Sequence, residues 1–459
     1  AASAVEQPNF IFFITDDISW NDLGCYGNTF VRTPNLDRLA TEGMAFDNCY
    51  LAISSCSPSR CSIITGRYPH NTGAPELHTQ LPEGQYLFPL TLKEAGYYTV
   101  LSGKHHMGKA ADKAFATISK GKGPGREEDW VDILRNRPKD KPFFCWFAST
   151  DAHRGWTVND QAPRYDPQKI RVPPYLYDGP ATREDLAQYY HEVSRTDYFA
   201  GQIVEELQRQ GIAENTYFIY CGDNGRPFPR CKTRLYDSGI KSPLIIWRPG
   251  RVSPARCNSL VSSIDFAPTV LELAGLGRDE RIQGVSFAKL LDNPTATVRD
   301  YVFAEHNWHV FQAHERMVRY GNWVYIRNAW PERQNLCMES DPTYPAGREL
   351  WEAQAGGLLN DDQQGIFQKP LPAEELFDVS RDAFQLTNLA ASPDYAAVLS
   401  ELREVLDRWS AQTGDTVPEN PTNDRQDSQG RRNPDHHRGT FPGAERQATT
   451  INHRGPVRK

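Results

Sequence analysis

Short apolar runs recur along the first half of the chain and are separated by longer amphipathic stretches. Residues 10–14 read Phe-Ile-Phe-Phe-Ile without a polar position, which is typical of a parallel strand buried on both faces. The same pattern predicts further strands over residues 97–101, 143–148, 217–221 and 244–247. Because these strands alternate with helical stretches, they indicate a mostly parallel sheet that helices cover on both faces.

Two helices of this half are indicated by the residues at their ends. The stretch 34–43 follows Thr33, a capping residue, carries proline in its first turn and ends on glycine. A longer helix is predicted over residues 182–210, opened by a capping pattern of Thr182 and Asp185.

The second part of the chain has a different pattern. Residues 295–328 are aromatic and strand-like, residues 330–372 are rich in loop formers, and the triplet Leu376-Phe377-Asp378 follows. Ser392 and Pro393 start a last helix, whose apolar face holds Val398, Leu402, Val405, Leu406 and Trp409. We therefore expect a large domain over residues 1–294, a small α+β subdomain over 295–413 and a polar tail over 414–459. The tail either wraps the surface or is partly disordered.

Composition excludes several classes of protein. With 459 residues, of which 39% are hydrophobic, the chain can bury a large core, and no apolar run reaches the roughly 18 residues of a membrane span. A net charge of −7 argues against a nucleic-acid partner, although a locally basic cleft could still bind a polyanion. Nine scattered cysteines without a C-x-x-C pair disfavour a zinc ribbon. Residues 1–7 lack a signal core, so the N-terminus is read as cytoplasmic or already processed.

Polar residues follow four of the predicted strands. They are Asp16 and Asp17 after the first, Lys104, His105 and His106 after the second, Asp151 and His153 after the third, and Asp223 and Asn224 after the fourth. In an open parallel sheet, the carboxyl ends of the strands collect the chemistry at one rim. The aspartates and Asn224 offer oxygen ligands, which suit Ca²⁺ or Mg²⁺ better than zinc. Helix capping is the alternative for any single aspartate.

A polar segment around one cysteine is the most specific motif of the chain. It reads Cys56-Ser57-Pro58-Ser59-Arg60 and is followed by Thr65-Gly66-Arg67. A helix that starts after Pro58 would direct backbone amides toward an anion, and Arg60 would add a forked donor for oxyanions.

This segment resembles the signature of the type I sulfatases, which are relatives of the alkaline phosphatases. The similarity extends to residues 9–17, 103–106, 151–153, 223–249 and 376–378. It implies an α/β fold with a large, mostly parallel mixed sheet between helices, in which residues 1–294 form the catalytic domain. In that family a formylglycine-generating or anaerobic maturation enzyme oxidises the motif's cysteine to formylglycine, an aldehyde that rests as its hydrate.

The resemblance also implies roles for single residues. The calcium ligands would be Asp16, Asp17, Asp223 and Asn224; the catalytic residues would be Cys56, Arg60, Lys104, His106, His153 and Lys232; Lys241 and His105 would be supporting. For Lys241, a structural ion pair is an equal alternative. The hydrate would attack sulfur while the cations neutralise charge, His153 would donate a proton to the leaving group, and His106 would act as the base.

Other segments resemble the N-sulfoglucosamine sulfohydrolase (heparan N-sulfatase) branch of the family. They supply six candidates for substrate contact: His78, Arg154, Arg226, Arg230, His306 and His309. One departure concerns Lys232, because that branch can carry arginine there whereas O-sulfatases carry lysine. We therefore expect a hydrolase that removes sulfate from a sulfated oligosaccharide, exo-acting and related to heparan N-sulfatase.

Three alternatives stay open at this point. They are an O-sulfatase for another polysaccharide such as an algal one, a phosphate or phosphonate monoester hydrolase of the same superfamily, and an inactive protein that binds sulfated glycans with unmodified Cys56. The habits of the family imply a periplasmic or secreted location.

Overall fold

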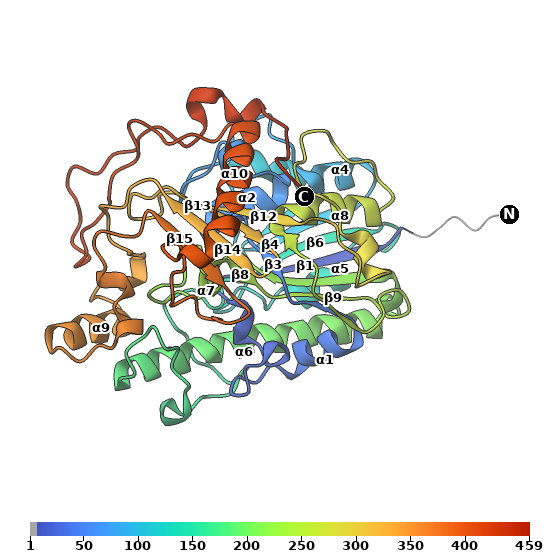
Figure 1. Cartoon of the computed structure of the whole chain (residues 1–459). Helices are drawn as coiled ribbons and strands as arrows, with labels where there is room; N and C mark the ends of the chain where they lie inside the picture. Colours follow the sequence, from blue (N-terminus) through green and yellow to red (C-terminus); the bar gives the residue numbers. More distant parts are fainter. Residues whose placement is uncertain (1–6) are drawn as a thin grey trace.

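An eight-stranded sheet runs through the larger part of the molecule, as a computed structural model that describes residues 7–459 shows (Figure 1). The interpretation of the N-terminus as processed or cytoplasmic concerns residues that lie, up to residue 6, outside the described ones. Across the sheet the order is β10 (Ala255–Cys257), β2 (Met44–Phe46), β9 (Leu244–Trp247), β7 (Thr216–Gly222), β1 (Asn9–Thr15), β6 (Phe143–Ala148), β4 (Tyr98–Gly103) and β5 (Thr117–Ser119).

Most neighbouring strands of this sheet are parallel, as the sequence predicts. Only β9 runs antiparallel to its neighbours β7 and β2, which makes the sheet mixed. The five predicted strands all form, and β6 and β9 have the predicted bounds. This confirms the expected fold class.

Both faces of the sheet are buried because side chains alternate along each strand. On β1, Phe10 and Phe12 pack into a core with α2 (Cys56–Thr65), α4 (Phe88–Glu94) and α8 (Phe266–Leu273). Ile11 and Phe13 point to the opposite core, which α1 (Pro34–Glu42), α5 (Trp130–Asn136) and the long α6 (Pro180–Arg209) cover. Figure 1 shows α1 and α6 together below the sheet.

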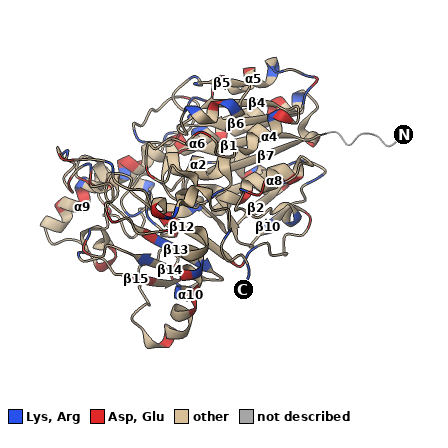
Figure 2. Ribbon diagram, turned by 90° about the horizontal axis from the view of Figure 1, so that it is seen from above, with Lys and Arg blue, Asp and Glu red and all other residues tan. Residues whose placement is uncertain are grey.

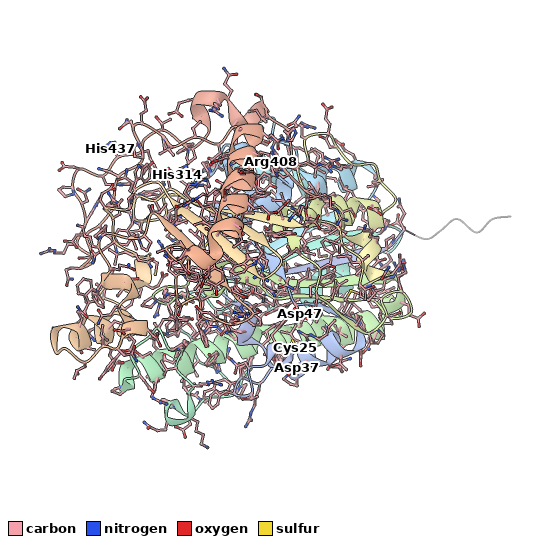
Figure 3. The ribbon with its side chains drawn as sticks, in the orientation of Figure 1. Cys25, Asp37, Asp47, His314, Arg408 and His437 are labelled. Carbon is pink, nitrogen blue, oxygen red and sulfur yellow. The ribbon has the colours of Figure 1, made fainter. Side chains whose placement is uncertain are left out.

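Helix α1 begins and ends where the sequence predicts, but Thr33 does not cap it. The Thr33 hydroxyl donates to the carboxylate of Asp37 at 3.0 Å and caps no helix amide. Asp37 also accepts from the amide of Cys25 at 2.7 Å, and Figure 3 shows these two residues along the lower edge of the molecule. The first amides of α1 are instead bonded to α6: the carboxylate of Asp197 accepts from the amides of Asn35 and Leu36 at 3.3 and 2.7 Å.

The capping pattern predicted for α6 is wrong. The helix begins at Pro180, and the carboxylate of Glu349 accepts hydrogen bonds from the amides of Ala181 and Thr182 at 2.9 and 2.8 Å. A residue distant in sequence thus fills the position that a local side chain was expected to fill.

A four-stranded antiparallel sheet forms a second layer beside the first. Its strands are β12 (Tyr301–His306), β13 (Glu315–Tyr320), β14 (Trp323–Asn328) and β15 (Glu374–Asp378), and α10 (Ala396–Thr413) packs on it. The predicted strands and last helix are confirmed. Within the stretch expected to be loops, however, α9 (Pro345–Ala355) forms, so the prediction is wrong there. Only Ala346, Leu350 and Ala353 among its apolar residues are buried, which leaves a weak helical signal.

Short elements join the two layers. A small sheet is formed by three strands of two residues each: β11 (Val261–Ser262), β3 (Cys49–Tyr50) and β8 (Lys241–Ser242). Two short helices, α3 (Pro69–Thr72) and α7 (Asp237–Ile240), are single turns. Figure 2 shows the second layer next to the large sheet, with acidic and basic residues interspersed over both. In the part of the chain described, no helix has the length and apolar character that would let it cross a membrane.

Residues 414–459 run across both layers and are bonded to them. The Arg67 guanidinium donates to the carbonyls of Thr449 and Ile451, at 3.1 and 3.0 Å. On the side where Figure 3 labels His314 and His437, the ring of His314 lies 3.0 Å from the carbonyl of Thr416. The tail is therefore in place to contribute to sites on either layer.

Candidate active site

The four strands with polar residues at their ends are neighbours in the large sheet. The strands β7, β1, β6 and β4 are adjacent and parallel, so their carboxyl ends meet at one edge. The structure thus brings Asp16, Asp17, Lys104, His106, His153, Asp223 and Asn224 to one rim, as expected. All three aspartates are fully buried.

Cys56 is the first residue of α2. The helix begins three residues earlier than predicted, because Ser55 is extended and its carbonyl already accepts from the amide of Ser59 at 2.8 Å. Pro58 lies within the first turn, where the amide that it lacks would have no helical partner. The side chain of Cys56 therefore projects from the positive end of a helix.

The sulfur of Cys56 lies against the carboxylates of β1. Its thiol donates to Asp16 Oδ1 at 3.7 Å and to Asp17 Oδ1 at 4.0 Å. Burial raises the pKa of the Cys56 thiol to about 12, although Lys104 and Lys232 oppose this shift. An unmodified Cys56 is therefore a protonated thiol at neutral pH and a weak nucleophile.

Three pairs of opposite charges surround Cys56. Arg60 Nε lies 2.8 Å from Asp223 Oδ2, Lys232 Nζ lies 2.7 Å from Asp17 Oδ1, and Lys104 Nζ bonds to Asp16. The carboxylates respond differently. Burial alone would raise the pKa of each, but Lys104 holds the pKa of Asp16 well below its ordinary range. Burial raises the pKa of Asp17, and it raises that of Asp223 to about 6.

The oxygen atoms at this edge fit a hard divalent cation. Asp16, Asp17 and Asp223 supply carboxylates, and the carboxylates of the first two lie close to each other beside Cys56. The amide of Asn224 donates to Asp17 Oδ1 at 2.5 Å, while its own Oδ1 is buried without a hydrogen-bond partner among the described residues. A buried oxygen that lacks a donor is a site at which a cation would be accommodated.

Two histidines, His78 and His106, lie next to each other near Lys104. His106 Nε2 and His78 Nδ1 are 2.8 Å apart, so one ring donates to the other. Burial and then the charge of Lys104 lower the pKa of His106 to about 2. His106 is therefore neutral at ordinary pH and can accept a proton. Its Nδ1 and the Nη2 of Arg60 are both buried without a partner in residues 7–459.

The backbone is unusual at three residues of this site. Asp17, His78 and His106 have φ values of 57°, 63° and 58°, in the left-handed region that residues other than glycine rarely adopt. Such conformations persist where the surrounding structure enforces them, and they concentrate at functional sites.

His153 lies at the exposed rim of the site. Its charge is among the influences that lower the pKa of both Asp16 and Asp17, which places it near these carboxylates. Its Nδ1 lies 3.0 Å from the carbonyl of Arg154. The carbonyl of Arg154 thus positions the ring through Nδ1, and Nε2 does not take part in this contact.

The six candidates for substrate contact fall into two groups. His78 is exposed beside His106, and His309 lies 2.7 Å from the hydroxyl of Ser55, the residue before Cys56. For these two, and for Arg154, substrate contact stays a prediction. The Arg154 guanidinium is held by both carboxylate oxygens of Asp185, each at 2.8 Å.

The other group is buried and bonded within the protein. Arg226 lies 3.0 Å from Asp22, and His306 lies 2.5 Å from Glu315. Arg230 donates to the carbonyls of Phe384 and Gln385. Arg226, Arg230 and His306 are each 6% exposed or less, as is His309, and for them too substrate contact stays a prediction. The local motif placed them near the site, but their long-range partners were not visible in it.

Neither supporting residue reaches Cys56 through a bond that the structure shows. Lys241 lies 3.9 Å from Asp237 and 4.0 Å from the centre of the Trp20 ring, which agrees with the structural alternative. His105 lies 2.9 Å from Asp112.

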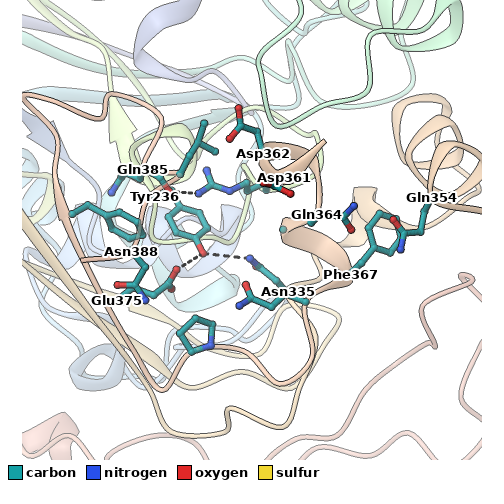
Figure 4. A pocket seen from close by; sticks show the side chains of 16 residues that line it. Tyr236, Asn335, Gln354, Asp361, Asp362, Gln364, Phe367, Glu375, Gln385 and Asn388 are labelled. Atoms are coloured by element: carbon teal, nitrogen blue, oxygen red, sulfur yellow. Dashed lines mark hydrogen bonds between the residues drawn. The ribbon is translucent and has the colours of Figure 1, made fainter. Parts of the chain in front are cut away.

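Arg230 lines a pocket together with Tyr236, Asn335 and Glu375, and Figure 4 labels the last three. Its guanidinium stacks on Tyr236, 3.8 Å from the ring centre. The Tyr236 hydroxyl donates to Glu375 at 3.0 Å and accepts from Asn335 at 3.3 Å. Burial, together with the nearby Glu315, raises the pKa of Glu375 to about 7.

These residues predict a pH dependence of stability. A carboxyl whose pKa is raised on folding stabilises the fold fully below its unfolded pKa, and the contribution is lost as pH rises through about 7. Glu375→Gln keeps the shape without the charge, so we expect it to be more stable than the wild type at pH 8 by about 1–3 kcal/mol. At pH 4.5 the two should be equal. Urea unfolding at both pH values measures the difference, and a variant with the same pH dependence as the wild type would contradict the assignment.

Three residues around the site were not predicted from the sequence. Against the effect of burial, and after closer charges, the carboxylate of Glu339 contributes to the raised pKa of Lys232. The guanidinium of Arg154 stacks on the ring of Tyr344, 5.0 Å from its centre. The charge of Arg425, on the tail, contributes after burial to the lowered pKa of both His78 and His309. All three lie beyond residue 330, where no motif marked them.

Comparisons with known proteins identify the family of this chain. A model of the Sulfatase family matches residues 8–123 and 128–276, and a model described as N-sulphoglucosamine sulphohydrolase, C-terminal, matches residues 231–326. An "Ulvan-active sulfatase" of Formosa agariphila is 32% identical to this chain in an alignment 471 residues long. The alignment covers 89% of this chain and 76% of that protein. The N-sulphoglucosamine sulphohydrolase of Homo sapiens is 28% identical over 464 residues, covering 89% of this chain and 90% of that protein.

The fold agrees as well. A solved structure of a protein in complex with its substrate D-glucosamine-2-N,6-O-disulfate has a TM-score of 0.69 to this chain at 20% identity. The alignment covers 88% of this chain and 98% of that one.

Proposed function

This chain belongs to the sulfatase family and is a carbohydrate sulfatase, a hydrolase of sulfate esters or sulfamates; we propose that it acts through formylglycine made from Cys56 and a bound Ca²⁺. Its substrate in this proposal is a sulfated oligosaccharide, from whose end it removes sulfate. A maturation enzyme would be needed to convert Cys56.

One observation carries the proposal, namely the surroundings of Cys56. The thiol is buried at a helix N-terminus against two carboxylates, and its pKa is raised to about 12. A cysteine that attacks directly would need the opposite shift, toward the thiolate. Conversion to a hydrated aldehyde would supply a hydroxyl nucleophile that needs no thiolate.

The cation would be held by Asp16, Asp17, Asp223 and Asn224. Ca²⁺ fits this all-oxygen set, and Mg²⁺ is the alternative. When bound, it would supply positive charge for the oxygens of the nucleophile and of the sulfate group.

The other residues bind the sulfate group and move protons. Lys104 and Lys232 would neutralise the sulfate oxygens, and the free Nη2 of Arg60 would donate to the group at position 56. His106 is neutral and would accept a proton there. His153, at the exposed rim, would donate a proton to the leaving oxygen or nitrogen.

The role of His153 predicts a difference between substrates. An activated aryl sulfate has a leaving group that needs no proton, whereas a sugar hydroxyl does. We expect His153→Ala to lower kcat about 10²- to 10⁴-fold on a sulfated oligosaccharide and only a few-fold on 4-nitrophenyl sulfate. The pH profile on the oligosaccharide should also lose its alkaline limb. Equal losses on both substrates would speak against an acid role.

The sugar and the sulfate position are distinguished by a substrate panel. The two relatives named above act, by their names, on ulvan and on N-sulfoglucosamine. Lysine at position 232, where the heparan N-sulfatase branch can carry arginine, leaves the choice between an N-sulfate and an O-sulfate open. Sulfate release should be measured on defined heparin disaccharides beside ulvan oligosaccharides. On a sulfated tetrasaccharide, an exo-acting enzyme would remove sulfate from the terminal residue only. Faster turnover of 4-nitrophenyl phosphate or of a phosphonate monoester than of any sulfate would overturn the proposal.

A further inference from the structure

The tail carries one arginine to the candidate active site and fixes its backbone there. The amide of Arg425 donates to the carbonyl of Val310 at 2.8 Å, and its own carbonyl accepts from Asn433 at 2.8 Å. Val310 follows His309, whose ring bonds to Ser55, the neighbour of Cys56. A short path of bonded residues therefore connects Arg425 with the start of α2.

The charge of Arg425 has no opposite charge beside it. Among residues 7–459, no carboxylate lies within ion-pair distance, and the nearest polar contact of its guanidinium is the sulfur of Met338 at 3.9 Å. Tyr344 is close enough to interact, but burial raises the pKa of its phenol to about 12, so it stays neutral.

The acidic residues next to Arg425 in the tail are bonded elsewhere. Asp424 pairs with Arg333, and Asp427 lies 2.7 Å from Arg431. Another tail arginine near the site, Arg438, is paired as well, with Glu76 at 3.0 Å. Arg425 thus differs from Arg431 and Arg438 in being left without a counter-charge among the described residues.

A half-buried cation without a partner is costly, because desolvation is not offset by an ion pair. Burial accordingly lowers the pKa of Arg425. The charge acts on the side of the site where His78 and His309 lie, since it contributes to the lowered pKa of each after burial. An arriving anion would relieve this cost, and a guanidinium binds carboxylate and sulfate oxygens through two parallel hydrogen bonds.

We propose that Arg425 binds a second anionic group of the substrate, either a uronate carboxylate or a sulfate other than the one that is cleaved. The inference rests on the proposed function and adds a binding site on the tail to it. Substrates with one negative charge would not use this site, so Arg425 would select for polyanionic sugars.

The test compares Arg425→Gln with the wild type on three kinds of substrate. They are 4-nitrophenyl sulfate, D-glucosamine-2-N,6-O-disulfate, and heparin or ulvan oligosaccharides that carry one sulfate and one uronate. We expect the KM of Arg425→Gln to rise about tenfold on substrates whose second anionic group is the kind that Arg425 binds, with kcat little changed. KM on 4-nitrophenyl sulfate should not change. The second and third substrates distinguish a sulfate from a carboxylate as the bound group.

Two control variants separate binding from structure. Arg431→Gln removes a paired, exposed arginine of the same tail and should behave as the wild type. Arg425→Lys keeps the charge and should recover part of the affinity. Because Arg425 has no ion pair to lose, Tm of Arg425→Gln should be equal to or above that of the wild type.

The outcomes distinguish this inference from the function beneath it. Equal KM values of Arg425→Gln and wild type on all polyanionic substrates would overturn the inference alone, as would a KM rise of the same size on 4-nitrophenyl sulfate. If the mature wild type releases sulfate from none of the substrates, the proposed function falls, and the inference with it.

Discussion

Cys56→Ala is expected to lower kcat on every sulfated substrate by at least about 10⁴-fold, because it removes the group that forms the nucleophile. The fold should persist. The methyl group keeps the place of the buried side chain at the start of α2, and the three ion pairs around it do not involve the sulfur. Binding of a sulfated oligosaccharide should therefore be retained, which calorimetry on the variant measures.

A matched control lies in the same helix. Cys61 is also buried, but it belongs to the apolar core that α2, α4 and α8 form with the sheet, and it has no polar partner that the structure shows. Cys61→Ala should lose some stability and keep kcat. Equal losses of activity in the two variants would show that the helix, and not the chemistry at position 56, limits turnover.

Mass spectrometry supplies an independent reading of the same residue. Conversion of a cysteine to formylglycine lowers its mass by about 18 Da. Peptides that contain residue 56 should show this loss in active preparations, and activity should scale with the converted fraction. Full activity in protein with intact Cys56 would reject the formylglycine proposal and favour a different nucleophile.

Much of the rim could be predicted from the sequence because its geometry follows from topology. Asp16 and Asp223 come directly after buried apolar runs, and adjacent parallel strands must end at one edge of a sheet. The order of the strands was not needed for this argument. A short run of residues therefore sufficed to place carboxylates and cations together.

Other features depend on partners that are distant in the chain. Glu349 binds the first amides of α6 across more than 160 residues, so the local Thr182 pattern was misleading. The ion pair of Arg226 with Asp22, about 200 residues earlier in the chain, was likewise not visible in the local motif. For the same reason Arg425 was missed: nothing in the polar tail marks the arginines that the fold brings near the site.

The metal proposal predicts an effect on stability that does not depend on turnover. Without a cation, burial and, after it, the charge of Asp16 raise the pKa values of Asp17 and Asp223. A cation that binds only the folded state at 100 times its Kd stabilises it by about 2.7 kcal/mol. For a chain of this size, we expect Ca²⁺ to raise Tm of chelated protein by about 2–5 °C. Activity should fall at least about 100-fold on chelation and return with Ca²⁺.

The pH dependence of this shift follows from the carboxyls that must lose protons. Asp223, with a pKa of about 6, and Asp17, whose pKa is also raised, stabilise the metal-free fold at low pH, and this contribution is lost as pH rises through 6. Because the cation binds the ionised carboxylates, its stabilising effect should grow over the same range and be small near pH 4. Asn224→Ala removes the unpartnered oxygen without changing the charge, so it should weaken the Ca²⁺-dependent rise in Tm. A rise of the same size in this variant, or one independent of pH, would place the cation elsewhere.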